Sequence, residues 1–286
     1  MIEEKDVTIA VAVSHTPWRD DRALTMHALR KQLGMADGGF AANEFFRAYK
    51  EFDQPEKVQE WSESMHRWLA STDASYCVCL QDDAVLAPNF FPALRALLTA
   101  YPHSIVGLEA VHPGGRMLAR AGQHVYTTSD GLIGVGYVIP RKALLEKLRW
   151  QSESLHYGAL ESMTEDALVN VFALSTGRLI LHPCPTILDH IVEMPSSYGN
   201  DDHPYRSPSV LWTDGDVCGW ELADLERPEF WRNSPPVHMG RFYGGTIDLC
   251  KRWVRTSTAD QRAVAMADSG PQMIRKWVPF FGRAGA

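Results

Sequence analysis

The sequence predicts an α/β sandwich, in which helices cover both faces of a mostly parallel central sheet. Short apolar runs alternate with helical patterns between residues 7 and 190, a spacing typical of parallel sheets. The composition, with 45% apolar and 22% charged residues, is ordinary for a globular protein. The length of 286 residues can bury a large core, either as one domain or as a domain with a tail.

Six short runs have the composition of buried strands. Each is brief and apolar, and the first, VTIAVAV, is rich in β-branched residues. The second, SYCVCL, leads directly into the polar sequence Gln81-Asp82-Asp83. In chain order, the expected strands or short extended pieces cover residues 7–13, 75–80, 104–108, 134–139, 179–181 and 186–188.

Helices are expected between these strands, and their ends carry sequence signals. Asp20 or Asp21 can cap the first helix, and Gly34 can end it. Thr164 is a suitable N-cap for the last helix, and Gly177 can stop it. In chain order, the expected helices cover residues 20–33, 56–70, 89–100, 140–151 and 164–174.

The alternating pattern ends near residue 195. Residues 1–195 are therefore expected to form the main domain, and residues 196–286 a C-terminal extension that packs on it. Residues 195–240 are rich in Pro, Ser, Gly, Asp and Trp, and long irregular segments of this kind are often functional lids. Residues 273–283 mix basic and aromatic side chains, and we expect them to dock on the domain rather than on a membrane or a partner.

Net charge and cysteine usage argue against several classes of protein. The formal net charge of −7 is unfavourable for a protein held to nucleic acid by its phosphates. The five cysteines form no CxxC pair, so they indicate neither a zinc ribbon nor a disulfide framework. No signal peptide is recognisable, and no apolar run approaches the ~20 residues that span a bilayer. We therefore expect a soluble protein of the reducing cytoplasm, without a transmembrane segment.

Two adjacent acids, Asp82 and Asp83, follow the second apolar strand. Holding two carboxylates close together is unfavourable, and a divalent cation relieves their repulsion. Mg²⁺ and Mn²⁺ bind through one or two carboxylates together with phosphate oxygens and water. Such a cation also takes up the charge of a diphosphate leaving group. The alternative is that the two acids only cap the next turn and face water.

The run from Val78 to Pro88 (VCLQDDAVLAP) resembles the DxD region of GT-A glycosyltransferases. It is most similar to the "LEDD" motif of the bacterial lipopolysaccharide-type and related family-2-like sugar transferases. The resemblance implies a GT-A, Rossmann-like fold for residues 1–195, which would bind a nucleotide sugar. Gln81 stands where the family often has an acid. The resemblance therefore leaves Asp83 as the metal ligand and puts Asp82 near the ribose or sugar.

Other segments follow the order of motifs in this family. The loop of residues 16–19 resembles the one that receives the base and diphosphate, and the arginine in it is suited to phosphate. The glycine-containing run at 134–139 resembles the segment beside the donor sugar, and residues 196–206 resemble a loop that closes over the diphosphate. Besides the two acids, the residues thus assigned to donor binding are Thr16, Pro17, Arg19, Gly136, Ser197 and Arg206.

The catalytic residues implied by the resemblance are Glu165 and Asp166, which match the "ED" found before a helix in this class. Asp166 would be the base of an inverting enzyme that takes a proton from the acceptor hydroxyl. The alternative is that both acids merely complement the helix N-terminus. His190 resembles the third metal ligand of several GT-A families, and an imidazole can join carboxylates on Mn²⁺.

The sequence thus predicts a metal-dependent, hexosyltransferase-like enzyme that uses Mn²⁺ or Mg²⁺. It would move a sugar from a UDP- or GDP-linked donor to a hydroxyl of an acceptor such as a glycan. One alternative is a nucleotidyltransferase, although residues 14–20 lack the glycine-rich loop usual in that class. Another is a non-catalytic protein with a decayed site, which Gln81 keeps open. A narrower alternative is a modified nucleic-acid base as acceptor. The donor sugar, the nucleotide base and the oligomeric state stay open.

Overall fold

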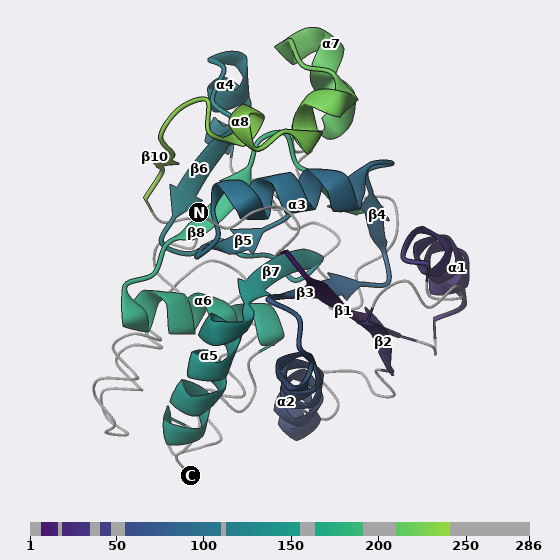
Figure 1. Cartoon of the computed structure of the whole chain (residues 1–286). Coiled ribbons are helices and arrows are strands. Elements are labelled where there is room, and N and C mark those ends of the chain that lie inside the picture. The colour runs from purple at the N-terminus through teal and green to yellow at the C-terminus, as the bar shows by residue number, and fades with distance from the viewer. Residues whose placement is uncertain are drawn as a thin grey trace.

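The computed structural model describes residues 7–16, 19–34, 41–46, 55–109, 113–154, 164–190 and 210–240. Its main feature is an eight-stranded sheet (Figure 1). The strands lie in the order β10 (Val237–His238), β6 (Val125–Thr128), β8 (Ile180–Pro183), β5 (Ile105–Gly107), β7 (Gly136–Pro140), β3 (Tyr76–Gln81), β1 (Ile9–His15) and β2 (Ala41–Phe46).

Most of the sheet is parallel. Strand β1 pairs in parallel with both β2 and β3, and β5 pairs in parallel with β8. Strand β7 lies between β3 and β5 and runs antiparallel to both, so that β2, β1, β3, β5 and β8 all run in one direction. Strand β6 is antiparallel to β8, and β10 follows β6. The carboxyl ends of β1, β3, β5 and β8 therefore meet at the same edge of the sheet, where ligands bind in open α/β folds.

Helices cover both faces of the sheet, and the inner strands β1, β3, β7, β5 and β8 are buried on both sides because of this. Alternate residues of β1 and β3 enter two separate hydrophobic clusters, with Val11 and Val78 in one and Ala10 and Cys77 in the other. Figure 1 shows α3 on one face and α2, α5 and α6 on the other. The helices are α1 (Ala23–Gln32), α2 (Pro55–Ser71), α3 (Phe90–Ala100), α4 (Pro113–Arg120), α5 (Arg141–Ser154), α6 (Glu165–Thr176), α7 (Gly215–Cys218) and α8 (Pro228–Trp231). The predicted α/β sandwich is confirmed.

Most of the expected helix signals are present at the described ends. Thr164 is the N-cap of α6, and Gly177 ends that helix in the left-handed conformation with φ of 69°. Gly34 likewise has φ of 60° after α1.

Two predicted helix starts were wrong. Asp20 and Asp21 lie in a 3-10 turn, and Arg22 is the N-cap residue of α1. Pro140 closes β7 instead of opening the next helix, so α5 begins at Arg141. Strand boundaries also differ, since the strand expected at residues 186–188 is Leu188–His190.

Several elements were not predicted from the sequence. Strand β2 reads AANEFF, which lacks β-branched residues, and α4 begins PGGR, where glycine disfavours a helix. Strands β4 (Ala84–Leu86), β6 and β10 are four residues long or shorter, so they show too little alternation to be recognised.

The described part of the C-terminal extension packs on α3. Its 3-10 turns are η5 (Trp212–Asp214) and η6 (Leu222–Glu226), and Trp220 and Trp231 are buried in the same cluster as α3. The Trp231 indole N–H donates to Leu225 O at 2.8 Å, and the Tyr101 hydroxyl donates to Trp231 O at 2.9 Å. These tryptophans are therefore core residues rather than platforms for a sugar ring. Among the described residues, no helix is both long and apolar enough to cross a bilayer.

Candidate functional site

A small second sheet places His190 beside the acid pair. Strand β4, which directly follows Asp83, pairs antiparallel with β9 (Leu188–His190). In this register Ala84 lies opposite His190, and Val85 lies opposite Asp189. The chain thus brings together two residues that the resemblance assigns to a metal, although more than a hundred positions separate them.

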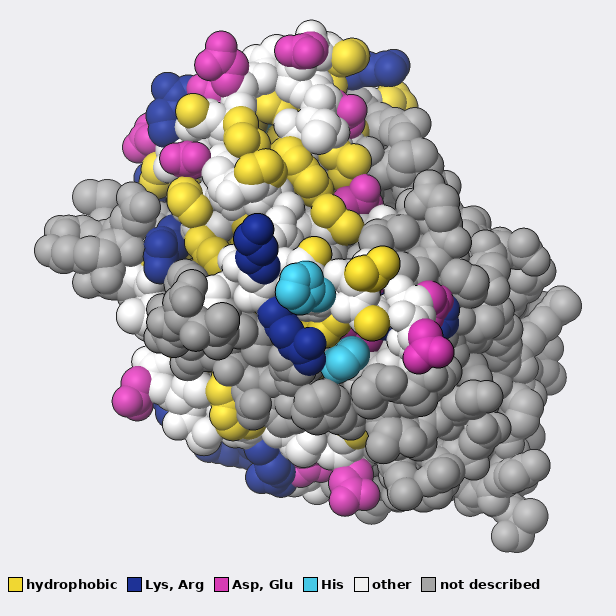
Figure 2. Space-filling model, turned by 90° about the vertical axis from the view of Figure 1, so that its right-hand side faces the viewer, with side chains coloured by type: hydrophobic (Ala, Val, Ile, Leu, Met, Phe, Trp, Pro, Cys, Tyr) yellow, Lys and Arg dark blue, Asp and Glu magenta, His cyan; other side chains and the backbone are white. Residues whose placement is uncertain are grey.

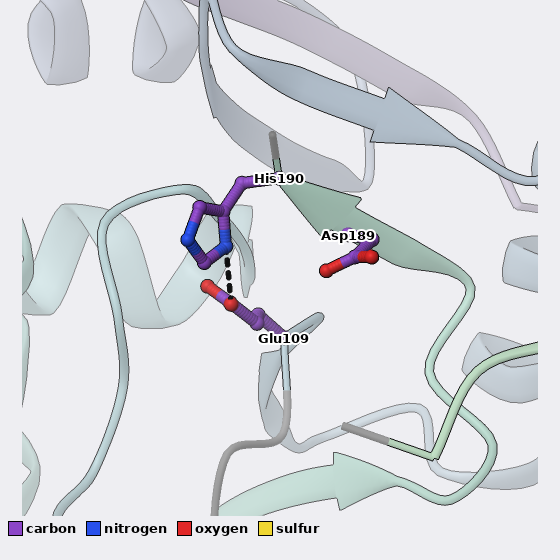
Figure 3. A group of neighbouring side chains, drawn as sticks. All are labelled: Glu109, Asp189 and His190. Carbon is purple, nitrogen blue, oxygen red and sulfur yellow. Dashed lines mark ion pairs between the residues drawn. The ribbon is translucent and has the colours of Figure 1, made fainter. Parts of the chain in front are cut away.

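Glu109 completes a cluster of potential metal ligands with Asp189 and His190. One ligand atom from each of the three lies within 4.8 Å of the others, and Figure 3 shows the side chains pointing toward one another. His190 Nδ1 and Glu109 Oε1 form an ion pair at 2.6 Å. Glu109 is only 2% exposed, and its Oε2 has no hydrogen-bond partner among the described residues. A buried, unpartnered carboxylate oxygen is unfavourable unless something else binds it.

The electrostatics link Asp83 to this cluster. Burial raises the pKa of Glu109; pairing with His190 opposes this, and the charges of Asp189 and Asp83 raise it further. For His190, burial lowers the pKa, but pairing with Glu109 and the charges of Glu109, Asp83 and Asp189 outweigh it, so the pKa is raised. These four residues therefore form one charge-coupled group, which we call the edge cluster. The cluster thus combines carboxylates with an imidazole, which are ligand types that Mn²⁺ accepts.

The acid pair itself is held by two neighbouring groups. Asp82 Oδ2 accepts hydrogen bonds from Thr16 N at 2.7 Å and from Thr16 Oγ1 at 2.8 Å. Arg22 Nη1 donates to Asp82 Oδ1 at 3.2 Å and pairs with Asp83 Oδ2 at 2.5 Å. Asp83 Oδ1 is buried and has no hydrogen-bond partner among the described residues. The loop after β1 and the acid pair after β3 thus meet at the sheet edge, as the strand order implies.

Arg19 lies near the acid pair but not on it. Its side chain forms a bidentate pair with Asp21, including a bond from Nε to Oδ1 at 2.9 Å. The hydrogen bond to Asp21 raises the pKa of Arg19, and the charges of Asp82 and Asp83 add to this from farther away. Arg19 is thus at the rim of the site, where a ligand phosphate would have to compete with Asp21 for it.

The two predicted catalytic acids point to different places. Asp166 is partly exposed, and Gly134 N donates to its carboxylate; burial raises its pKa, which the hydrogen bonds from Thr164 and the backbone oppose. A Cβ on Gly134 would stand 2.7 Å from Gln81 Nε2 and 3.4 Å from Asp166 Cγ. Gly134 therefore lets Asp166 approach the start of the acid motif. Glu165 is buried, and its charge acts on the interior residues Cys79 and Tyr137.

Gly136 serves the packing of the sheet. A Cβ at this position would overlap Leu188 Cδ1 and would lie 3.2 Å from Leu80 Cδ2, so apolar side chains fill the space that the glycine leaves. Pro17, Ser197 and Arg206, which were also assigned to donor binding, lie outside the described residues.

The face of the molecule that carries β4 and α1 is chemically mixed. Figure 2 shows histidine, cationic and hydrophobic side chains close together near the centre of this face. Asp82, Asp83 and Glu109 are each at most 5% exposed, so these acids contribute little to the molecular surface.

Sequence reasoning missed Glu109 and Arg22. The one available signal for Glu109 was its position just after β5, at the same edge of the sheet as the acid pair. Arg22 follows the predicted Arg19 by three residues, within the 3-10 turn η2 (Asp20–Arg22). No model of a known protein family matches the chain, and no curated protein matches it in sequence. A functional assignment therefore depends on the geometry of this edge.

Proposed function

We propose that this protein is a metal-dependent glycosyltransferase of the GT-A type. It would move a sugar from a UDP- or GDP-linked donor to an acceptor hydroxyl, with inversion at the sugar carbon. The observation that carries the proposal is the edge cluster. Asp83, Glu109, Asp189 and His190 are charge-coupled, and two of their buried carboxylate oxygens lack a partner among the described residues.

The chemistry of these donors suits a divalent ion. Carboxylate oxygens bind Mg²⁺ and Mn²⁺, and an imidazole is an acceptable ligand for Mn²⁺. A bound ion would neutralise the diphosphate as its bond to the sugar breaks. In this proposal Asp83 and His190 bind the ion. Arg19 lies at the rim of the site, where the donor phosphate would approach.

Asp166 is the residue best placed to act as the base. It is partly exposed, whereas Glu165 is buried toward the interior. A carboxylate with a raised pKa is a stronger base, so the burial that raises the pKa of Asp166 assists proton removal from a hydroxyl. Glu165 lies in the first turn of α6, where a carboxylate complements the helix N-terminus.

The topology is compatible with the GT-A assignment. Strand β3, which leads into the acid pair, is flanked on one side by the parallel strand β1 and on the other by the antiparallel strand β7. The small sheet of β4 and β9 adds the histidine to the acid motif. The proposal is supported by the fold and the site together, since the fold alone is compatible with many activities.

The test is Mn²⁺-dependent donor binding by the full chain and by Asp83→Ala. Thermal melts with UDP- and GDP-sugars should show a rise in Tm that requires Mn²⁺ in the wild type, because a ligand of the folded state stabilises it by mass action. Asp83→Ala should abolish that rise and sugar transfer, while the exposed Asp73→Ala should preserve both.

Three outcomes would redirect the assignment. Unchanged donor binding and turnover in Asp83→Ala would remove the metal role. Donor binding without transfer or hydrolysis would favour the non-catalytic alternative that Gln81 suggests. Pyrophosphate release from a nucleoside triphosphate and a sugar phosphate would favour the nucleotidyltransferase.

A further inference from the structure

The acid pair has its own internal cation, Arg22. This residue ends the 3-10 turn η2 and is the N-cap residue of α1, so its backbone is fixed between the loop after β1 and the helix. Its side chain is 4% exposed. A buried arginine is uncommon unless it is paired, and here one guanidinium nitrogen, Nη1, contacts both Asp82 and Asp83.

This arrangement gives the two acids different numbers of hydrogen-bond partners. Asp82 accepts three hydrogen bonds, two from Thr16 and one from Arg22, which occupy most of its acceptor positions. Asp83 contacts Arg22 through Oδ2 only, and its Oδ1 stays without a partner among the described residues. The charge of Asp83 is felt by both Glu109 and His190, so it belongs to the edge cluster.

We propose that Arg22 is a positioning residue that divides the acid pair into an anchor and a ligand. It joins Thr16 in fixing Asp82 as the anchor of the loop after β1, and it holds Asp83 by one oxygen so that the other serves the metal. The proposal rests on the metal-dependent function proposed above, and it assigns the adjacent acids separate roles. It differs from the family resemblance, which places Asp82 against the donor.

The charges support this division. Two adjacent buried carboxylates would repel each other, and the shared guanidinium offsets that repulsion before any metal binds. A planar, permanently charged guanidinium can contact two carboxylates at once, whereas a lysine ammonium is a point charge. Arg22→Lys should therefore keep the charge but lose part of the orientation.

The test is a Mn²⁺ titration of the full chain, followed by the loss of the free-ion signal in electron paramagnetic resonance. Arg22→Met should weaken Mn²⁺ binding by roughly 10- to 100-fold, the range typical when a group that orients a metal ligand is removed. Arg22→Lys should recover part of that loss. Asp83→Asn should abolish binding, whereas Asp82→Asn should change the affinity by less than about threefold, well under the effect of losing an orienting partner. The exposed Arg67→Met is the matched control and should bind as the wild type does.

Unfolding in urea with EDTA gives a second measurement that needs no metal. Arg22→Met and Asp82→Asn should each destabilise the fold, and the double variant should lose less than the sum, because the two residues share one contact. This cycle also identifies a variant that fails to fold, in which case Arg22→Lys and Asp82→Asn carry the comparison.

The outcomes separate this inference from the proposed function. Equal Mn²⁺ affinity in Arg22→Met and the wild type overturns the role of Arg22 and leaves the enzyme assignment intact. Loss of Mn²⁺ binding in Asp82→Asn, as complete as in Asp83→Asn, also overturns it. A wild-type chain that binds no Mn²⁺ overturns the proposed function itself, whatever the unfolding cycle shows.

Discussion

Two polar clusters in this molecule have opposite electrostatic character. The edge cluster lies at the carboxyl end of the sheet, and the second lies in the layer between the sheet and helices α2 and α5. In the second, Lys147 Nζ donates to His66 Nδ1 at 3.0 Å and to Gln151 Oε1. His66 Nδ1 therefore accepts, and its Nε2–H donates to the Tyr137 hydroxyl at 2.7 Å. We call these four residues the interior network.

Burial favours the neutral forms of Lys147 and His66 in the interior network, whereas the edge cluster gathers buried carboxylate oxygens that lack a hydrogen-bond partner among the described residues. Burial lowers the pKa of Lys147 to about 7 and that of His66 well below its usual value, so both groups approach neutrality. No acid forms an ion pair with Lys147 among the described residues. In the edge cluster, by contrast, Glu109 and Asp83 retain unpartnered oxygens beside other acids.

This difference supports separate roles for the two clusters. A low-dielectric interior disfavours charge, so buried groups that lack a counter-ion approach neutrality and bond to one another. Buried carboxylate oxygens without a hydrogen-bond partner are unfavourable, and the cation proposed above would relieve that cost. Changes in the interior network should therefore alter stability alone, and changes in the edge cluster should alter metal binding.

The largest expected effect is a rise in stability with pH that depends on Lys147. The pKa of Lys147 is about 7 in the folded state and 10.5 for an unperturbed lysine, so between these values the unfolded chain binds the extra proton. Stability should then rise as pH increases above 7, by at most about 1.4 kcal/mol per pH unit from this group. Urea unfolding from pH 7 to 9 should show a steeper rise for the wild type than for Lys147→Met.

The pH window ends near 9 because of the buried thiols. Burial raises the pKa of Cys77 to about 12 and that of Cys79 well above the 9.0 of an unperturbed thiol. Above pH 9 the unfolded thiols ionise, and their contribution to stability falls as pH rises. Lys142→Met, an exposed change on the same helix, should keep the wild-type slope. Identical slopes for wild type and Lys147→Met would show that the interior lysine keeps an ordinary pKa.

Sequence pattern predicted the sandwich because burial on both faces leaves apolar runs that can be read directly. It also selected Asp83 and His190, which the β4–β9 pairing brings close together. The pairing itself could not be predicted from the sequence, since each strand has only three residues.

Glu109 and Arg22 could not be predicted because their roles arise from tertiary neighbours. Glu109 lies beside Asp189 and His190, which are 80 and 81 positions away in the sequence, and a single acid after a short strand is typical of a surface turn. In the sequence, Arg22 looks like any basic residue near the start of a helix. Only the tertiary structure shows that it pairs with Asp82 and Asp83. Local patterns carry no information on such distant partners.

A smaller effect is expected when one member of the edge cluster loses its charge. Glu109→Gln removes a carboxylate that pairs with His190 at 2.6 Å and has a second, unpartnered oxygen. Mn²⁺ binding should weaken by roughly 10- to 100-fold, whether Glu109 binds the ion or orients His190. Isothermal titration calorimetry measures this change. Glu146→Gln, which alters an acid of α5 paired with Arg178, is the matched control. Equal affinities in the two variants would place the metal elsewhere.

The smallest expected effect is a loss of stability from a change in the interior network. Tyr137→Phe removes the acceptor of the His66 Nε2–H, and both residues are buried without access to water. The free energy of unfolding should fall by on the order of 1 kcal/mol, because a buried donor is left unpaired. Mn²⁺ affinity should be unchanged, since the lost hydroxyl belongs to the interior network and not to the edge cluster. A Tyr137→Phe variant with intact stability but weakened Mn²⁺ binding would show that the two clusters act as one.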